Sequence, residues 1–329
     1  MRTRLFLSLL LLTTTALAAP APPPATTLAF PQFKPGESLH MVAYGDMRFT
    51  APTRTDGTNP RVRKWLAEQV GRQNPAAILL TGDMPYFGSR AADWRQYALE
   101  TASWNKKHAL VLPAIGNHEL YGSVERGLAN YFHAYPQLRD HRYYSALLGS
   151  VEVISLDCTT STDKTGEQAA WFGEQLDRIP PQVEFLVILD HYPWMADWQS
   201  QLFAHLPDKP ALVLREVLEA HLPKLQAKVL VFNGHIHNYE RFQRNGVTYV
   251  VTGGGGAQPY PVLIRGGEDQ YLDKGFPVYH YLTIDVVNHQ LHAVMWKVKD
   301  PEAPTLDVEA KDQFTLTYTP RREQGSSGP

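Results

Sequence analysis

Short runs of apolar residues, each followed by a polar cluster or a turn signal, recur along most of the chain. Each run has the length of a β-strand and is rich in β-branched or aliphatic side chains, a composition that favours strands. The runs predicted as strands are His40–Tyr44, Ala76–Thr81, Ala109–Leu112, Val151–Leu156, Glu184–Leu189, Lys228–Phe232 and Val247–Thr252.

Two helices are predicted between these strands. The first begins with Asn59 as the N-cap and Pro60 at the first helical position, and it stops at Asn74-Pro75. Its predicted apolar face consists of Val62, Trp65, Leu66 and Val70. The second is expected to begin with a capping box formed by Thr165 and Gln168. Its predicted buried side consists of Trp171, Phe172, Leu176 and Ile179.

The C-terminal part predicts a β-hairpin, because Tyr279–Ile284 and Leu291–Val298 alternate in polarity on either side of Asn288-His289. These strands are too numerous for one small open sheet. The predicted fold class is therefore α/β, with a two-sheet β-sandwich flanked by helices.

The two ends of the chain are expected to lie outside this domain. Residues 1–18 are typical of a signal peptide: Arg2 and Arg4 precede the apolar run Leu5–Leu12, and Ala16-Leu17-Ala18 provides a cleavage site near Ala18. A retained membrane anchor is the alternative. Residues 19–36 form a Pro/Ala/Thr-rich leader, 37–320 the domain and 321–329 a flexible tail. We expect a secreted or periplasmic protein without a membrane span after cleavage.

Composition excludes some partners. The formal net charge is -2, and no basic stripe predicts a nucleic-acid platform or an anionic membrane surface as partner. Cys158 is the single cysteine, so the chain cannot form an intrachain disulfide. We interpret Cys158 as a buried structural thiol, and a nucleophilic cysteine is the alternative.

Polar clusters follow five of the predicted strands. Because ligands of α/β proteins bind at the carboxyl ends of strands, these clusters are expected to converge on one crevice. Glycine before the polar residue permits a sharp turn. The clusters are Gly45-Asp46, Gly82-Asp83-Met84-Pro85-Tyr86, Gly116-Asn117-His118-Glu119, Asp190-His191 and Gly234-His235-Ile236-His237.

Carboxylate, imidazole, amide and phenol groups together suit first-row metals, and the absence of thiolates argues against a zinc-finger site. The set suits a catalytic pair of metals about 3.5–4 Å apart, which binds both sides of an in-line phosphoryl displacement. The His235-x-His237 spacing is the most specific part, because a period of two puts both imidazoles on one side of an extended segment.

These motifs resemble those of the calcineurin-like metallophosphoesterase superfamily over roughly Met41–Trp296, and within it the purple acid phosphatase branch. Asp83-Met84-Pro85-Tyr86 matches the Asp-x-x-Tyr of that branch, and the segment from Gly234 to Arg241 matches its Gly-His-x-His-x-Tyr-Glu-Arg signature. The resemblance implies a four-layer αββα fold.

The resemblance also implies the metal ligands and the metals. The first metal, expected to be Fe(III), would be held by Asp46, Tyr86 and His237. The second, expected to be divalent Fe, Zn or Mn, would be held by Asn117, His191 and His235. Asp83 would bridge the two. A hard phenolate favours a trivalent ion, which predicts a visible tyrosinate-to-iron absorption band that depends on Tyr86.

Two further residues are candidates for catalysis. Arg48 stands where the wider superfamily has histidine, and it also departs from the small residue usual in the purple branch; it would either contact the substrate phosphate or form an ion pair. His118 is implied by the resemblance to face the leaving group, either donating a proton or holding a phosphate oxygen.

The predicted function is a secreted phosphoesterase in which two metals activate hydroxide to attack small phosphate monoesters, as acid phosphatases do. A phosphodiesterase or nucleotide pyrophosphohydrolase of the same fold is one alternative. A non-catalytic module that binds phosphorylated ligands is another.

Overall fold

The computed structural model describes residues 27–106, 108–160, 163, 165–199, 207, 209–273 and 275–320. The predicted signal peptide, the first part of the leader and the predicted tail lie outside these residues. None of the helices within the described residues has both the length and the apolar character needed to cross a bilayer.

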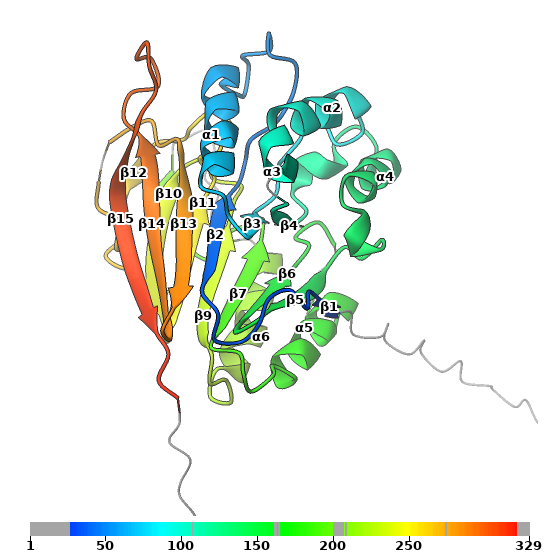
Figure 1. The fold of residues 1–329 in the computed structure, drawn as a ribbon, viewed down its shortest axis with the longest axis vertical. Coiled ribbons are helices and arrows are strands. Elements are labelled where there is room, and N and C mark those ends of the chain that lie inside the picture. The colour runs from blue at the N-terminus through cyan, green and yellow to red at the C-terminus, as the bar shows by residue number, and fades with distance from the viewer. Residues whose placement is uncertain are drawn as a thin grey trace, which may run out of the picture.

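Two large sheets pack face to face (Figure 1). The six-stranded sheet has the order β15 (Val308–Thr317), β14 (Gln290–Val298), β13 (His280–Val287), β2 (Leu39–Tyr44), β3 (Ala77–Leu80) and β4 (Leu110–Pro113). The seven-stranded sheet has the order β1 (Thr27–Ala29), β5 (Tyr144–Leu148), β6 (Val151–Ser155), β7 (Phe185–Asp190), β9 (Lys228–Asn233), β11 (Val247–Thr252) and β10 (Tyr239–Arg244). A small sheet pairs β12 (Val262–Ile264) with β8 (Trp198–Gln199).

Helices flank the sandwich, which confirms the predicted fold class. On the side of the six-stranded sheet lie α1 (Pro60–Arg72), α2 (Ala91–Glu100), α3 (Ala102–Lys106) and α4 (Val124–Ala134). The other sheet is covered by α5 (Glu167–Asp177) and α6 (Lys209–His221). Two short 3₁₀ helices, η1 (Asn117–Leu120) and η2 (Pro136–Leu138), follow β4 and α4.

The period of two along the buried strands produces these layers. Val153, Val187 and Leu230 belong to the core between the two sheets. Their sequence neighbours Ile154, Ile188 and Val231 belong instead to the core beneath α5 and α6. Strands buried on both faces need apolar residues at every position, which is why they are continuous apolar runs in the sequence.

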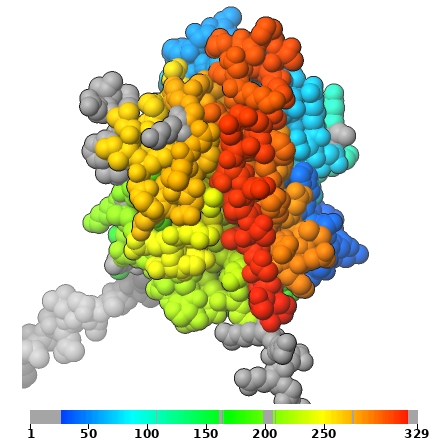
Figure 2. Space-filling view, turned by 90° about the vertical axis from the view of Figure 1, so that its left-hand side faces the viewer, coloured from blue at the N-terminus to red at the C-terminus, as the bar shows by residue number. Residues whose placement is uncertain are grey.

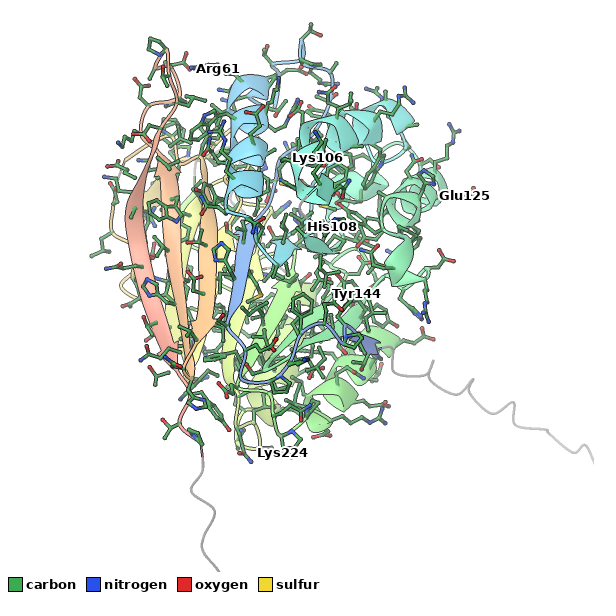
Figure 3. The ribbon with its side chains drawn as sticks, in the orientation of Figure 1. Arg61, Lys106, His108, Glu125, Tyr144 and Lys224 are labelled. Carbon is green, nitrogen blue, oxygen red and sulfur yellow. The ribbon has the colours of Figure 1, made fainter. Side chains whose placement is uncertain are left out.

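Charged and aromatic side chains take different positions in the fold, as residues labelled in Figure 3 illustrate. Charged side chains such as Glu125 and Lys224 lie at the periphery, whereas Tyr144 is buried and its hydroxyl donates to the carbonyl of Pro113 at 2.9 Å. The edge strand β15 runs along one open face of the molecule (Figure 2).

The predicted helix starts differ in outcome. The Asn59 side chain accepts from the N–H of Val62 and caps α1, as predicted. The capping box at Thr165 is wrong, because α5 begins at Glu167 after Gly166, which supplies no side-chain cap. The side chain of Gln168 is instead used at Asp157, where it accepts from the backbone N–H at 2.8 Å and donates to the carbonyl at 3.0 Å.

Three other expectations can be compared with the fold. Residues Asn288 and His289 join β13 to β14 in left-handed conformations, which confirms the hairpin. Strand β1 pairs in parallel with β5, so packed structure begins within the 19–36 segment that we predicted as a leader. Cys158 is buried, and burial raises the pKa of its thiol, which fits the structural interpretation.

Candidate metal centre

The candidate ligands lie in the loops that follow β2, β3, β4, β7 and β9, all at one end of the sandwich. Three of them, Asp46, Asp83 and His235, adopt left-handed backbone conformations with φ of 58°, 56° and 69°. Such conformations are uncommon outside glycine and cluster at functional sites. A Cβ atom on Gly234 would lie 2.5 Å from an Asp46 carboxylate oxygen, so glycine is required there for close approach.

Three ligand groups meet in the interior. One ligand atom from each of Asp46, Asp83 and His191 lies within 4.8 Å of the others, and all three side chains are fully buried. Asn117 joins them through its Oδ1, 3.1 Å from Nε2 of His191. Segments from four separate loops, those after β2, β3, β4 and β7, therefore converge on one crevice, in agreement with the strand-end argument.

The tautomer of His191 is fixed by the backbone. Its Nδ1 donates to the carbonyl of Thr81 at 2.8 Å, since a carbonyl only accepts. In the neutral ring, Nε2 then presents a lone pair to oxygens of Asn117 at 3.1 Å and Asp83 at 3.3 Å. Three electron-pair donors in contact repel one another unless a cation lies among them, so this arrangement fits a metal ion.

His237 repeats the same arrangement. Its Nδ1 donates to the carbonyl of Gln258 at 2.6 Å. Its Nε2 is buried, lies 3.6 Å from an oxygen of Asp46 and has no hydrogen-bond partner among the residues that the structure describes. Burial lowers the pKa of both His237 and His191, so both rings are neutral and available as ligands.

His235 reaches the site by another route than the predicted extended segment. Its left-handed backbone directs its N–H to both carboxylate oxygens of Asp46, at 3.1 and 3.0 Å. Its ring centroid lies 5.1 Å from that of His191 and 4.6 Å from that of Tyr192. Both imidazoles of the His-x-His motif therefore lie at the crevice, with Ile236 buried between them.

The two buried carboxylates differ in their surroundings. Burial and the nearby charge of Asp83 raise the pKa of Asp46 well above its usual range. Burial also acts to raise the pKa of Asp83, but its interactions with His118, His191 and Arg48, including the hydrogen bond from the His118 N–H, hold that pKa below its usual range. Two adjacent buried carboxylates need a compensating cation, which a metal pair supplies.

Tyr86 lies half-buried at the edge of this cluster. The guanidinium of Arg54 lies 3.8 Å from the centre of its ring, and the His118 ring meets it edge-on at 5.6 Å. Within the described residues, no hydrogen bond joins the Tyr86 side chain to Asp46 or His237. The structure thus puts the predicted phenol beside the metal site, without a direct contact to its expected co-ligands.

Tyr260 is a second phenol at the site, and sequence reasoning missed it. Its ring stacks on His237 with 4.4 Å between centroids, and its N–H donates to the His237 carbonyl at 3.0 Å. Burial raises the pKa of its hydroxyl. The charge of Arg48 acts to lower this pKa, and the charge of Asp46 acts to raise it. Only its position shortly after the glycine run 253–256 could have indicated this role.

Arg48 points into the site. Its guanidinium lies 3.4 Å from an Asp83 oxygen, and its side chain is 13% exposed. Buried Arg63 donates to the Arg48 carbonyl at 3.2 Å while pairing with Glu100 at 2.6 Å, so the left-handed turn at Arg48 is fixed from behind. Of the two expectations for Arg48, the ion pair is present.

His118 is also held in place at the site. Its Nδ1 donates to the Tyr86 carbonyl at 2.7 Å, and its Nε2 faces Asp83 at 3.8 Å. Burial lowers the pKa of its ring to about 4. Its backbone N–H donates to Asp83 Oδ1 at 2.9 Å, which joins the loop after β4 to the loop after β3.

Glu119 is a further residue to which sequence reasoning gave no role. Its buried carboxylate accepts from the N–H groups of Asp83 at 3.0 Å, Met84 at 2.8 Å and Gly116 at 2.7 Å. These three bonds hold the turns that carry Asp83 and Asn117. Glu119 therefore acts as a brace, because its carboxylate holds together the two loops that carry these candidate ligands.

The aromatic loop after His191 mainly packs. Trp194 is fully buried, its indole N–H donates to Asp190 Oδ2 at 2.8 Å, and its ring meets Phe172 edge-on. The Asp190 carboxylate therefore helps to hold Trp194 in place.

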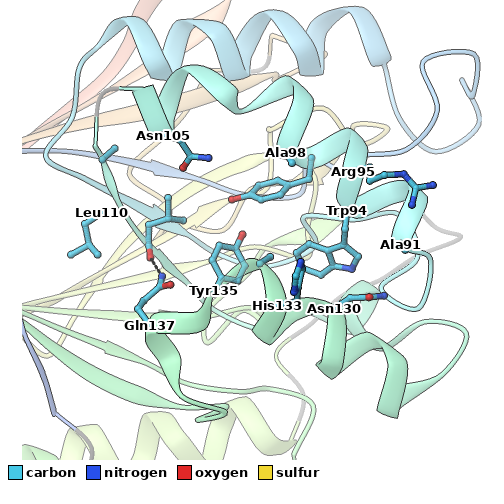
Figure 4. Close-up of a pocket in the computed structure, with 14 residues that line it drawn as sticks. Ala91, Trp94, Arg95, Ala98, Asn105, Leu110, Asn130, His133, Tyr135 and Gln137 are labelled. Carbon is cyan, nitrogen blue, oxygen red and sulfur yellow. Dashed lines mark hydrogen bonds between the residues drawn. The ribbon is translucent and has the colours of Figure 1, made fainter.

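A separate cavity of about 730 Å³ lies between α2, α3, β4 and α4 (Figure 4). The rings of Trp94 and Tyr135 form part of its wall, and Gln137 donates to the Val111 carbonyl at 3.0 Å beside it. None of the candidate metal ligands lines it. The metal centre is thus identified by its donor groups and not by the size of its cavity.

Comparisons with known proteins identify the family of the chain. The family model of calcineurin-like phosphoesterases matches residues 39–239. A probable purple acid phosphatase of Arabidopsis thaliana is 27% identical over 194 residues, which cover 54% of this chain and 42% of that protein. A phosphoenolpyruvate phosphatase of Allium cepa is 27% identical over 232 residues, which cover 64% and 43%. The chain spans less than half the length of these relatives.

Solved structures share the fold. A purple acid phosphatase from yellow lupin seeds superposes with a TM-score of 0.67 at 19% identity, covering 86% of this chain and 55% of that one. A dimetal phosphatase from Danio rerio gives 0.57 at 14% identity, covering 85% and 99%. Since the family model spans more than half of the chain, the protein belongs to the calcineurin-like phosphoesterase family.

Proposed function

We propose that this protein is a secreted phosphatase with two metal ions that hydrolyses small phosphate monoesters. One observation carries the proposal. Two buried imidazoles, His191 and His237, each bond the backbone through Nδ1 and turn Nε2 toward carboxylate oxygen. This is the arrangement of metal-binding histidines, whose other nitrogen is fixed by a hydrogen bond.

The proposed ligand sets follow the family motifs. The proposed first metal is Fe(III), held by Asp46, Tyr86 and His237. The proposed second metal is divalent Fe, Zn or Mn, held by Asn117, His191 and His235. The proposed bridge is Asp83, which lies 3.3 Å from His191 through one oxygen and 3.8 Å from His118 through the other. A rotation of the Tyr86 side chain is part of this proposal.

When bound, such metals supply a nucleophile by lowering the pKa of coordinated water. The protein's own groups would do the rest. Arg48 would move from Asp83 to an equatorial phosphate oxygen once the metals neutralise that carboxylate. Because Nδ1 of His118 donates to a carbonyl, Nε2 is the nitrogen left for the substrate, and only in the protonated ring would that atom donate a hydrogen bond or its proton to the departing oxygen.

The proposed substrate class and location rest on the relatives, the net charge and the N-terminal sequence. The relatives named as purple acid phosphatases and as a phosphoenolpyruvate phosphatase support small phosphorylated substrates. The net charge of -2 argues against nucleic acid as a partner. Export rests on the N-terminal pattern around Arg2, Arg4 and Ala18.

The test combines elemental analysis with steady-state kinetics. Protein supplied with iron and zinc is expected to retain two metal equivalents and to hydrolyse 4-nitrophenyl phosphate in preference to bis(4-nitrophenyl) phosphate. A preference for the diester would favour a phosphodiesterase or pyrophosphohydrolase. Two bound metals and phosphate binding without hydrolysis of either ester would favour a non-catalytic binding module.

A further inference from the structure

Three aromatic side chains gather on one side of His118, and we call them the aromatic wall: Tyr86, Phe87 and Tyr121. The Tyr121 ring lies over the His118 ring with 4.1 Å between centroids. Phe87 contacts Tyr86 at 5.1 Å and Tyr121 at 6.2 Å. Tyr121 is 42% exposed, and the other two rings are half-buried, so the wall presents apolar surface to solvent beside a catalytic candidate.

Two arginines lie on the wall. Arg54 lies 3.8 Å from the centre of the Tyr86 ring and 5.6 Å from that of Phe87. Arg90 lies 4.0 Å from the centre of the Phe87 ring. Arg54 pairs with Asp56 at 2.8 Å, and Asp56 is 72% exposed, so this pair is screened by water and readily exchanged. The wall therefore combines planar surface with positive charge.

The wall is also held rigidly with respect to His118. The Phe87 N–H donates to buried Asp93 at 2.9 Å, the Gly88 N–H donates to the His118 carbonyl at 2.8 Å, and the Ser89 N–H donates to the Tyr121 carbonyl at 3.2 Å. A surface held by hydrogen bonds loses little conformational entropy when a ligand binds. Plain core packing does not require large rings to be presented at the surface in this way.

We propose that the aromatic wall is the binding site for the leaving group of the substrate, and that it selects phosphate monoesters whose leaving group is a planar aromatic ring bearing a second negative charge. The ring stacks on Phe87 and Tyr121, the two members of the wall that do not have to turn toward the metal, and the second charge pairs with Arg90, which lies on Phe87. The inference rests on the proposed phosphatase activity, since the wall adjoins the atom that faces the departing oxygen.

The test uses three substrates: 4-carboxyphenyl phosphate, phenyl phosphate and glycerol 2-phosphate. Each variant is judged by its fold-loss in kcat/KM relative to the wild type, so that the intrinsic reactivity of each ester cancels. Arg90→Gln is expected to lose about 3- to 10-fold on 4-carboxyphenyl phosphate beyond its loss on phenyl phosphate. For Tyr121→Ala and Phe87→Leu, kcat/KM for both aryl esters is expected to fall about 3- to 10-fold more than kcat/KM for glycerol 2-phosphate.

Arg95→Gln is the matched control, because Arg95 is an exposed arginine on the helix that Arg90 precedes and it lines the separate cavity. It is expected to leave all three rates unaltered. Equal fold-losses on the three substrates in the wall variants would overturn the inference while leaving the phosphatase proposal intact. Wild-type protein with bound metals that hydrolysed none of the three would remove the proposed activity itself.

Discussion

The two halves of the sandwich contribute different chemistry to the candidate metal centre. The loops after β2, β3 and β4 contribute oxygen ligands, from Asp46, Asp83 and Asn117. The loops after β7 and β9 contribute nitrogen, from His191 and the His235-x-His237 segment. One half thus provides the negative charge, and the other provides the imidazoles of His191 and His237, whose tautomers are fixed by hydrogen bonds to the backbone.

Neither half is suited to hold metals alone. The oxygen half brings two buried carboxylates together, and burial and then the charge of Asp83 raise the pKa of Asp46. In the nitrogen half, the candidate ligands His191 and His237 carry no charge with which to attract a cation, because burial lowers their pKa. Closing the sandwich joins the two, so metal binding is expected to be linked to folding.

Removing the bridge is expected to have the largest effect. Asp83→Ala should lose both metals and lower kcat by on the order of 10⁴-fold or more, because it deletes the carboxylate that would bridge the two ions. The matched change in the nitrogen half, His191→Ala, should lose one metal equivalent. Elemental analysis after gel filtration measures both, and equal metal content in the two variants would contradict the division between the halves.

His118→Ala is expected to have the second-largest effect on catalysis. Loss of the group at the departing oxygen should lower kcat/KM for glycerol 2-phosphate by about 10²–10⁴-fold, and far less for 4-nitrophenyl phosphate, whose leaving group needs no proton. Equal losses on the two esters would assign His118 a positioning role.

Glu119→Gln should weaken metal affinity about 10–100-fold. The amide offers only one acceptor oxygen where the carboxylate now receives three backbone N–H groups, from Asp83, Met84 and Gly116. Competition with a metal chelator measures the affinity. Affinity equal to that of the wild type would mean that these turns hold without the brace.

The smallest expected effect concerns stability in the nitrogen half. Burial raises the pKa of Glu240, in β10, from its ordinary 4.5 to about 8. The folded state therefore binds more protons than the unfolded state in this window, and the stability that protonated Glu240 contributes is lost as pH rises toward 8. Between about pH 5 and about pH 8, the melting temperature of Glu240→Gln should therefore fall less than that of the wild type, with both proteins measured in the same buffers. An identical pH dependence in both proteins would refute this role.

The sequence predicts the central strands and the ligand loops well, because strands buried on both faces are continuous apolar runs and polar residues end them abruptly. Strands β10 and β15 were missed, since Tyr239–Arg244 and Val308–Thr317 mix polar and apolar residues at the edges of their sheets. These two strands form because they pair with β11 and β14, and the local pattern of polar and apolar residues carries no information about that pairing.

The same distinction applies to the site. The candidate metal ligands were predicted from their motifs, whereas the roles of Glu119 and Tyr260 depend on contacts between distant loops. Tyr260 stacks on His237, which lies 23 positions earlier and on another strand end. The Thr165 capping box failed for a related reason, because tertiary contacts at Asp157 recruit Gln168.

Anomalous diffraction from crystals grown with iron and zinc would show whether the crevice between the two halves holds two metals. Two peaks are expected there, on either side of the Asp83 carboxylate. The groups expected around them are Asp46, Tyr86 and His237 for one, and Asn117, His191 and His235 for the other. No peak in that crevice, or peaks bound only by groups of one half, would contradict the account.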